Sequence, residues 1–541
     1  MFKLGAIRLG ASATSPRRTA KAAGAACLVA LCFVIASCKN GASGSDSETV
    51  PSVAKNQTLT VGVASLLQQY VDPILANEGG GNYAMKWAIG EPLIRQDLNL
   101  KPIPALATSW DISPDKKTWT FHLRKGVKMQ DGSEFTANDV ATSIKRVQQN
   151  SDMTSYATYA SKVASVQVVD DLTIQIASKA PYATLGLDTP PPVATAYYNK
   201  VGEQDFRKRP VAAGQFKLVS QKYNDSVTLE RFDDFWDSDR KPNFKTLVVK
   251  IVPEESSRIA GLISGQLDMI TGLTPNGIAQ LQGNGTAKLI RSKEAQTATV
   301  NLVDGYNHPD SKLTDVRVRK ALLMGLDREA LAKGLYKGMG SVPNNLTYSV
   351  TLGNDPSLKA VPYDPNGARA LLKEAGAGDL RFTVNSYSTT SSYPDVQKFA
   401  EAVVGQWKDL GVNVDLNIMD PANYVDKMTK HQLDGATVQG APSVLFSADP
   451  SKTYIWYGAN GPYSATKDPK WQQLFADLDA SVDEGERTRI ATEMSQYAYE
   501  SLYVLPVVRL DAVSAIGPKV AEWTQMEGNP YAGPFWYLRA K

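Results

Sequence analysis

The sequence predicts an α/β protein built from two or three domains. Its 541 residues are more than one hydrophobic core of ordinary size accommodates. Residues 118–124 alternate between apolar and polar side chains, which predicts a half-buried strand, and residues 399–416 predict an amphipathic helix followed by a strand. Hydrophobic residues make up 43% of the chain and charged residues 21%, so the composition is that of a soluble globular protein.

The first 37 residues predict a secretory signal peptide. They hold five cations and no acid, and their apolar run over 22–37 is shorter than the roughly 20 residues that span a bilayer. The run ends in Ile35-Ala36-Ser37-Cys38, which resembles a bacterial lipobox, so we expect Cys38 to carry the lipid and to begin the mature chain. Residues 38–56, rich in Gly, Ser, Ala and Asp, are then a flexible tether.

Loss of the leader changes the charge and cysteine counts. Removing its five cations from the 58 Lys and Arg leaves 53 cations against 55 acids. A mature surface so close to neutral argues against a nucleic-acid partner. Cys27 and Cys32 leave with the leader, so Cys38 is the only mature cysteine, which excludes a disulfide within one chain and a cysteine metal site.

Residues 104–146 follow a long and regularly spaced pattern. Its fixed positions are Pro104, Leu106-Ala107, Ser109-Trp110, Asp115, Thr118, Thr120-Phe121, Leu123-Arg124, Gly126-Val127, Asp131-Gly132, Phe135-Thr136-Ala137, Asp139-Val140, Ser143 and Arg146. Thr136 and Asp139 have the spacing of a capping box, which predicts a helix that begins near Ala137. The pattern resembles the signature of family 5 extracytoplasmic solute-binding proteins, the oligopeptide, dipeptide and nickel binders of ABC importers. Met129 departs from it at a position that is usually aromatic.

The resemblance extends from about Leu59 to Trp523 and implies a two-lobe periplasmic-binding-protein-like fold of type II, cluster C. It implies three regions, which we call by the same names below. The lobe I core comprises 57–95, 206–295 and 507–541, the extra subdomain of lobe I comprises 96–205, and lobe II comprises 296–506. Lobes joined by crossing segments are expected to close on a solute by hinge motion.

Five residues are candidates for the lining of the cleft between the lobes: Tyr83, Asp449, Trp456, Tyr457 and Tyr463. Tyr83 follows a glycine-rich loop, and the aromatic residues near 456 either stack on the solute or pack in the core. Peptide binders of the family carry an aspartate a few residues before the position of Asp449, because a buried ammonium needs a carboxylate. Residues 439–446 contain no acid, so Asp449 either replaces that aspartate or, as we favour, caps a helix.

Enzyme motifs are absent from the sequence. The three histidines lie far apart, and there is no HExxH, GxSxG or GxxxxGK(S/T) pattern. Two carboxylates can still meet in a fold, so a secreted glycosidase-like hydrolase stays open as the third hypothesis. Bare nickel is disfavoured because His and Cys are so few.

We therefore expect a monomeric, lipid-anchored solute-binding subunit without a cofactor, on the outer face of the cytoplasmic membrane. Its partners are an ABC permease, the ATPase subunits and a small solute. An oligopeptide is the first choice for that solute, and an oligosaccharide or another small solute is the alternative.

Overall fold

The computed structural model describes residues 57–66, 70–75, 82–150, 152–153, 156–285, 287–388, 395–442, 449–454, 463–525 and 535–541. The contacts divide the chain into Met1–Pro51 and Ser52–Lys541, and every described residue belongs to the second unit. The predicted signal peptide, Cys38 and tether lie outside the described residues. No helix within the described ranges is long and apolar enough to cross a membrane.

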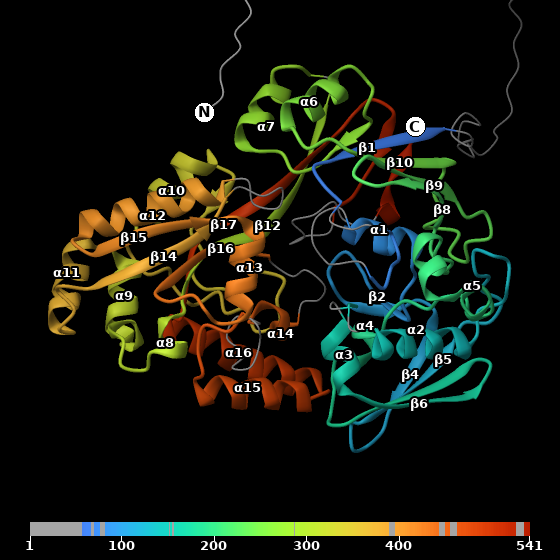
Figure 1. Cartoon of the computed structure of the whole chain (residues 1–541), viewed down its shortest axis with the longest axis horizontal. Helices are drawn as coiled ribbons and strands as arrows, with labels where there is room; N and C mark the ends of the chain where they lie inside the picture. Colours follow the sequence, from blue (N-terminus) through green and yellow to red (C-terminus); the bar gives the residue numbers. More distant parts are fainter. Residues whose placement is uncertain are drawn as a thin grey trace, which may run out of the picture. The chain divides into compact units, whose positions relative to one another are not determined.

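An 11-stranded sheet, counted over the described residues, is shared by both lobes (Figure 1). Its order is β15-β14-β16-β12-β17-β11-β1-β10-β9-β8, and β13 pairs with β17 off this path. The strands are β1 (Thr58–Val63), β8 (Phe216–Lys222), β9 (Ser226–Arg231), β10 (Thr246–Ile251), β11 (Met269–Ile270), β12 (Lys288–Leu302), β13 (Gly340–Ser341), β14 (Arg381–Tyr387), β15 (Asn413–Met419), β16 (Ala436–Pro442) and β17 (Val504–Ile516).

Two long antiparallel strands, β12 and β17, connect the lobes. Near Lys288 the pair lies beside β11 of the lobe I core, and near Leu302 it lies beside β16 of lobe II. The ladder between them is interrupted between Ser292 and Gln296, where the register shifts. Figure 1 shows both strands running from the lobe I strands to β16.

The extra subdomain has a sheet of its own, in the order β4-β5-β7-β6. On β5 the side chains of Trp119, Phe121 and Leu123 are buried and those between them are partly exposed, which confirms the predicted half-buried strand. The predicted capping box is also present, because the Thr136 amide donates to the Asp139 carboxylate at 2.8 Å. The elements are β4 (Ala107–Ile112), β5 (Thr118–Leu123), α2 (Ala137–Gln149), α3 (Ala157–Lys162), β6 (Val163–Asp170), β7 (Thr173–Ser178), α4 (Leu185–Asp188) and α5 (Thr195–Lys208).

Shorter elements complete the lobe I core. Helix α1 packs against the 3-10 turn at Phe535–Tyr537, where the Trp87 and Trp536 rings lie 6.2 Å apart. The remaining elements are α1 (Asn82–Ile89), β2 (Ile94–Gln96), β3 (Pro102–Pro104), α6 (Glu255–Ile263), α7 (Pro275–Gln282), β18 (Val520–Glu522) and β19 (Arg539–Ala540).

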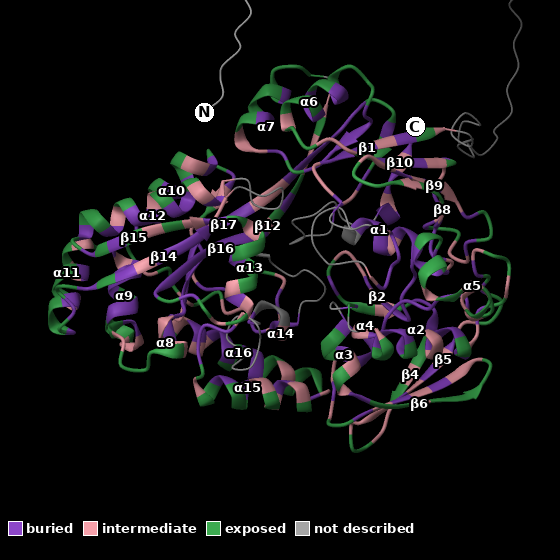
Figure 2. Cartoon of the chain, viewed as in Figure 1, coloured by how far each residue is buried: buried purple, intermediate pink, exposed green. Residues whose placement is uncertain are grey.

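Helices cover both faces of the lobe II part of the sheet. Ala298 and Val300 of β12 face a core that includes Trp407, whose indole nitrogen donates to the Leu322 carbonyl at 2.9 Å. Val504 belongs to a second core, on the side of α15 and α16. Buried residues mark these strands in Figure 2. The helices are α8 (Asp304–Asn307), α9 (Val316–Met324), α10 (Arg328–Tyr336), α11 (Pro365–Glu374), α12 (Val396–Leu410), α13 (Pro421–Thr429), α14 (Pro450–Thr453), α15 (Pro469–Ala480) and α16 (Glu484–Ser501).

Helix α12 and strand β15 confirm the helix and strand that periodicity predicts over residues 399–416. The helix buries Phe399, Val403 and Trp407, as its amphipathic pattern requires. The exact limits of the lobe I core, the extra subdomain and lobe II stay predictions.

Candidate functional site

Two sets of parallel strands point toward each other along the β12–β17 pair. Strands β1, β10 and β11 run in the same direction as β12 and lie beside its beginning, whereas β14, β15 and β16 run in the opposite direction and lie beside its end. The carboxyl ends of both sets therefore converge on the stretch of β12 between Ile290 and Gln296. In α/β sheets, ligands bind outside the carboxyl ends of parallel strands. This convergence defines the candidate functional site.

On the lobe II side, aromatic residues gather at the carboxyl ends of the strands. Tyr387 ends β14, and its ring lies 4.8 Å from that of Tyr424 on α13. Burial raises the pKa of Tyr387 to about 12, so the phenol is neutral at physiological pH. Tyr463 packs on the same apolar cluster, and burial raises the pKa of its phenol as well. Tyr424 is almost fully buried, so Tyr387 and Tyr463, which are partly exposed, are the rings that can offer an apolar face and a neutral hydroxyl to a ligand.

Asp449 is the N-cap of α14, as its position before Pro450 predicts. Its Oδ1 accepts from the Ser451 amide at 2.9 Å, and its Oδ2 pairs with the Arg487 guanidinium. Arg487 also donates to the carbonyls of Leu478 and Ser481 at 2.6 and 2.7 Å. The capping role is confirmed. A solute-binding role for Asp449 stays a prediction, and an incoming ammonium would compete there with Arg487.

Of the four other predicted site residues, Tyr463 alone has a side chain within the described part of the chain. Tyr83 lies in the first turn of α1, and its side chain lies outside the described part of the chain, as do Trp456 and Tyr457. Tyr463 is half-buried against Met419, Tyr424, Met428 and Leu433. The structure thus brings Tyr463 to the carboxyl ends of the lobe II strands, where Tyr387 and Tyr424 join it. Those two tyrosines are not predicted from the sequence, and neither is strand β14, which ends at Tyr387.

Buried polar side chains line one face of β12 and β16 in lobe II. They are Thr297, Thr299, Asn301, Thr437 and Gln439. The Thr299 hydroxyl donates to the Gln439 carbonyl at 3.3 Å, but both amide atoms of Asn301 are fully buried and have no hydrogen-bond partner among the described residues. An unpaired buried polar group costs roughly 1–3 kcal/mol. This face of the sheet is therefore polar although it is buried.

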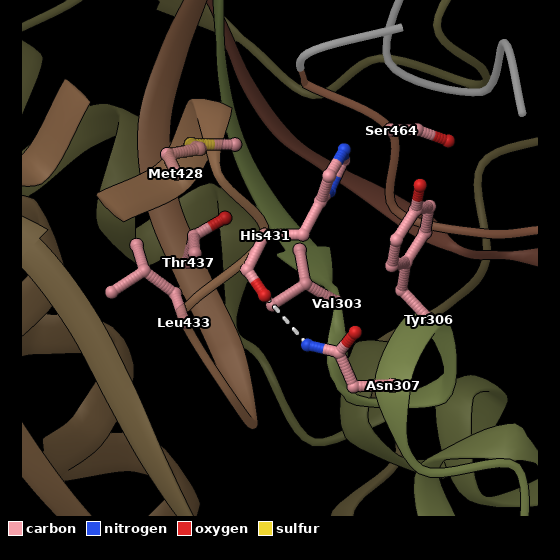
Figure 3. A pocket seen from close by; sticks show the side chains of 8 residues that line it. All are labelled: Val303, Tyr306, Asn307, Met428, His431, Leu433, Thr437 and Ser464. Carbon is pink, nitrogen blue, oxygen red and sulfur yellow. Dashed lines mark hydrogen bonds between the residues drawn. The ribbon is translucent and has the colours of Figure 1, made fainter. Parts of the chain in front are cut away.

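A small cavity lies beside the beginning of β16 (Figure 3). Its volume of about 10 Å³ has room for a single water molecule, far less than a solute site needs. The lining residues are Val303, Tyr306, Asn307, Met428, His431, Leu433, Thr437 and Ser464. The ring of His431 stacks on Tyr306 with 3.9 Å between centroids, and its carbonyl accepts from Asn307 at 2.7 Å.

One group of described residues has the composition of a metal site. Ligand atoms of Asp304, His308 and Asp434 all lie within 4.8 Å of one another, and His308 Nε2 is 3.0 Å from Asp434 Oδ1. His308 and Asp434 are exposed, and the Asp304 carboxylate already accepts from the Gly435 amide at 2.8 Å. We interpret the group as a solvated ion pair beside a backbone contact and infer no metal centre.

Comparison with solved structures defines the class of protein. NikA from Brucella suis, in complex with Fe(III)-EDTA, matches with a TM-score of 0.77 at 22% identity, over 90% of this chain and 100% of that chain. The fold is thus that of the two-lobe periplasmic binding proteins, which confirms the predicted fold class.

Sequence comparison gives the family. The chain is 30% identical to the dipeptide-binding protein of Escherichia coli over 354 residues, which is 60% of this chain and 65% of that relative. It is 26% identical to heme-binding protein A of Haemophilus influenzae over 537 residues, or 92% of this chain and 96% of that one. Residues 101–464 match the middle part of the bacterial extracellular solute-binding proteins of family 5, and the chain belongs to this family. The predicted family is confirmed, and with it the binding of a solute outside the cytoplasm.

Proposed function

We propose that the protein captures an oligopeptide between its lobes and delivers it to the permease of an ABC importer. The convergence of the two sets of carboxyl ends on β12 carries the proposal, because it supplies a binding site to which both lobes contribute. Two lobes joined by a pair of crossing strands can close on a solute and release it unchanged. ATP hydrolysis then belongs to the partner subunits.

Two features support a peptide as the solute. The E. coli relative is named as a dipeptide-binding protein. At the carboxyl ends of the lobe II strands, Tyr387 and Tyr463 are neutral, and Asp449 is already paired with Arg487. Such a site suits recognition through main-chain hydrogen bonds, with water in the side-chain pockets, rather than a single charged anchor. The same aromatic faces would suit a sugar, which keeps the oligosaccharide alternative in the test below.

Haem receives no support from the histidines, although one relative is named as a heme-binding protein. His122 lies 2.9 Å from Asp111, His308 pairs with Asp434, and His431 stacks on Tyr306 beside the start of β16. Each of the three histidines thus already contacts an acid or an aromatic ring. Axial ligation of haem iron by histidine is therefore not part of the proposal.

Attachment to the membrane through Cys38 is part of the proposal and follows from the lipobox-like sequence. A flexible tether over residues 39–56 would leave the folded lobes free to move at the outer face of the membrane and to reach the permease. Replacement of Cys38 by Ala is expected to release the mature protein into the medium or periplasm, as fractionation and immunoblotting would show. Retention of the variant on the membrane would refute the lipid anchor.

Thermal melting of the mature chain against panels of peptides, oligosaccharides and chelated metals tests the solute class. A bound solute at a hundredfold excess over its Kd stabilises the folded state by about 2.7 kcal/mol, which raises the melting temperature measurably. We expect peptides of two to several residues to give the shift. A shift with sugars alone would replace the peptide by the oligosaccharide alternative, and chromatographic detection of cleaved panel members would support a hydrolase.

A further inference from the structure

The extra subdomain touches lobe II at a place away from the crossing strands. Lys162, the last residue of α3, has its ammonium 2.6 Å from a carboxylate oxygen of Asp479, in the last turn of α15. The backbone carbonyl of Asp479 also accepts from the Ala183 amide at 3.3 Å. Figure 1 shows the ends of α3 and α15 beside each other. One residue of lobe II therefore contacts the subdomain through both its side chain and its main chain.

The subdomain side of this contact is held in place by its own structure. The Lys179 amide donates to the Lys162 carbonyl at 2.9 Å, which ties the end of α3 to the end of β7. The Lys162 ammonium lies 4.4 Å from the centre of the Tyr182 ring. Tyr182 is buried, and its hydroxyl donates to Asp188 at 2.8 Å. The cation–π contact with the buried Tyr182 ring therefore orients the Lys162 ammonium even when Asp479 is not in contact with it.

Other contacts lie between the same two regions. Val350 of lobe II packs on Leu98 and Leu100 of the subdomain, and Leu100 is almost fully buried. Arg489, and to a smaller extent Lys116 of the subdomain, lower the pKa of the Glu486 carboxyl at the start of α16. Opposite charges and apolar side chains thus face each other across this boundary. Apolar contact adds stability, and charge favours one relative orientation.

We propose that Lys162, Ala183 and Asp479 form a latch that favours the closed arrangement of the lobes and so retains the solute. The inference rests on the proposed closure, but not on the identity of the solute. The two side chains are 34% and 39% exposed, so water and salt screen the pair, and the contact can open and close. We expect loss of the latch to shift the ratio of closed to open molecules by about two- to fivefold, the range for exposed ion pairs.

The distance between two spin labels tests the latch without any solute. The mature chain with Cys38→Ala contains no cysteine, so Ser165→Cys and Gln472→Cys provide unique labels on exposed positions of the subdomain and of α15. Lys162→Met and Asp479→Asn are each expected to move the distance distribution toward longer values. The exchanged pair Lys162→Asp with Asp479→Lys is expected to restore it. Raising the salt concentration is expected to lengthen the distance in the parent protein but to change Lys162→Met little.

Lys208→Met is the matched control. It removes an exposed ion pair of 2.8 Å to Asp205, one turn away on the same helix α5, and it is expected to leave the distances unchanged. Unchanged distances in both single variants, or failure of the exchanged pair to restore the distribution, would overturn the latch. If a solute is known, its Kd is expected to rise by up to about fivefold in Lys162→Met. Failure of every panel to bind would refute the proposed function and leave the distance result intact.

Discussion

Arg146 of the extra subdomain and Arg328 of lobe II are buried among different partners. In the subdomain, Arg146 is 1% exposed and binds two carboxylates, Asp72 at 2.7 Å and Glu203 at 2.9 Å. In lobe II, Arg328 donates to the carbonyls of Pro343 and Pro506 at 3.1 Å, and to that of Val361. Arg319 likewise binds the carbonyls of Leu313, Thr314 and Ser501.

This difference separates two ways of stabilising a fold with a buried cation. A guanidinium held by carboxylates links elements that are distant in the chain and makes their stability depend on pH, because the acids titrate. A guanidinium held by carbonyls fixes irregular backbone and does not depend on a titrating partner. Burial lowers the pKa of Arg328 to about 10, which still leaves it charged at neutral pH. We make five predictions, from the largest expected effect to the smallest, and those for Arg146, Arg328 and Glu203 test the comparison directly.

Arg146→Met is expected to be the most destabilising change. It leaves Asp72, which is fully buried, without its cation, and breaking a buried ion pair in this way costs about 3–5 kcal/mol. Urea unfolding followed by circular dichroism measures the loss. Arg489→Met removes an arginine whose side chain is 59% exposed and is expected to leave the urea midpoint unchanged. An equal loss in both variants would contradict the buried network.

Arg328→Met is expected to lower the free energy of unfolding by about 2–3 kcal/mol, because the carbonyls of three residues, two of them buried, lose a charged donor. The same urea titration measures it. The titration is repeated at pH 4 and at pH 7. The loss of unfolding free energy in Arg328→Met is expected to be equal at the two pH values, because backbone carbonyls do not titrate. A loss that fades at pH 4 would show that a carboxylate, not the carbonyls, holds this arginine.

Asp449→Asn tests the one described carboxylate on our candidate list. It removes the ion pair with Arg487 while keeping a capping side chain, and we expect a loss of about 1.5–3 kcal/mol in unfolding free energy. Solute affinity, measured by titration calorimetry, is expected to stay the same if Asp449 only caps α14. A large loss of affinity at unchanged stability would place Asp449 in the binding site instead.

The stability of the subdomain is expected to fall in acid. Burial alone would raise the pKa of Glu203, but hydrogen bonds from Arg146 and Arg207 outweigh it and lower that pKa below its ordinary value of 4.5. A lowered folded-state pKa means that the stabilisation is present above pH 4.5 and is lost as the pH falls through the folded value. Glu203→Gln is expected to flatten the dependence of the urea midpoint on pH between 5 and 3. An unchanged slope would exclude Glu203 as the titrating group.

Asn301→Leu is expected to have the smallest effect, a change between zero and a gain of about 1 kcal/mol, because it removes a buried amide that has no partner among the described residues. Asn345→Leu is the matched control. The Asn345 amide donates to Ser495 at 3.0 Å and its oxygen accepts from Thr347, so its loss is expected to destabilise the fold. A comparable loss for Asn301→Leu would show that a bound water satisfies the amide.

Local patterns predicted the fold far better than the site. The strand at Trp119 and the helix cap at Thr136 depend on residues within a few positions of each other, and both are confirmed. The partners of Arg146 lie 74 and 57 positions away in the sequence, and Arg487 lies 38 positions from Asp449. No local spacing pattern predicts ion pairs between residues so far apart. The convergence of strands depends on register and order, which pairing fixes only in three dimensions.

The interruption in the ladder between β12 and β17 has a mechanical consequence. Because the register shifts between Ser292 and Gln296, regular pairing is absent over this short stretch, and we expect the two strands to flex there. Since β12 and β17 are paired on both sides of this stretch, the two strands are expected to bend together. We therefore expect the rotation axis of the two halves to pass through this interruption, close to the point on which the strand ends converge.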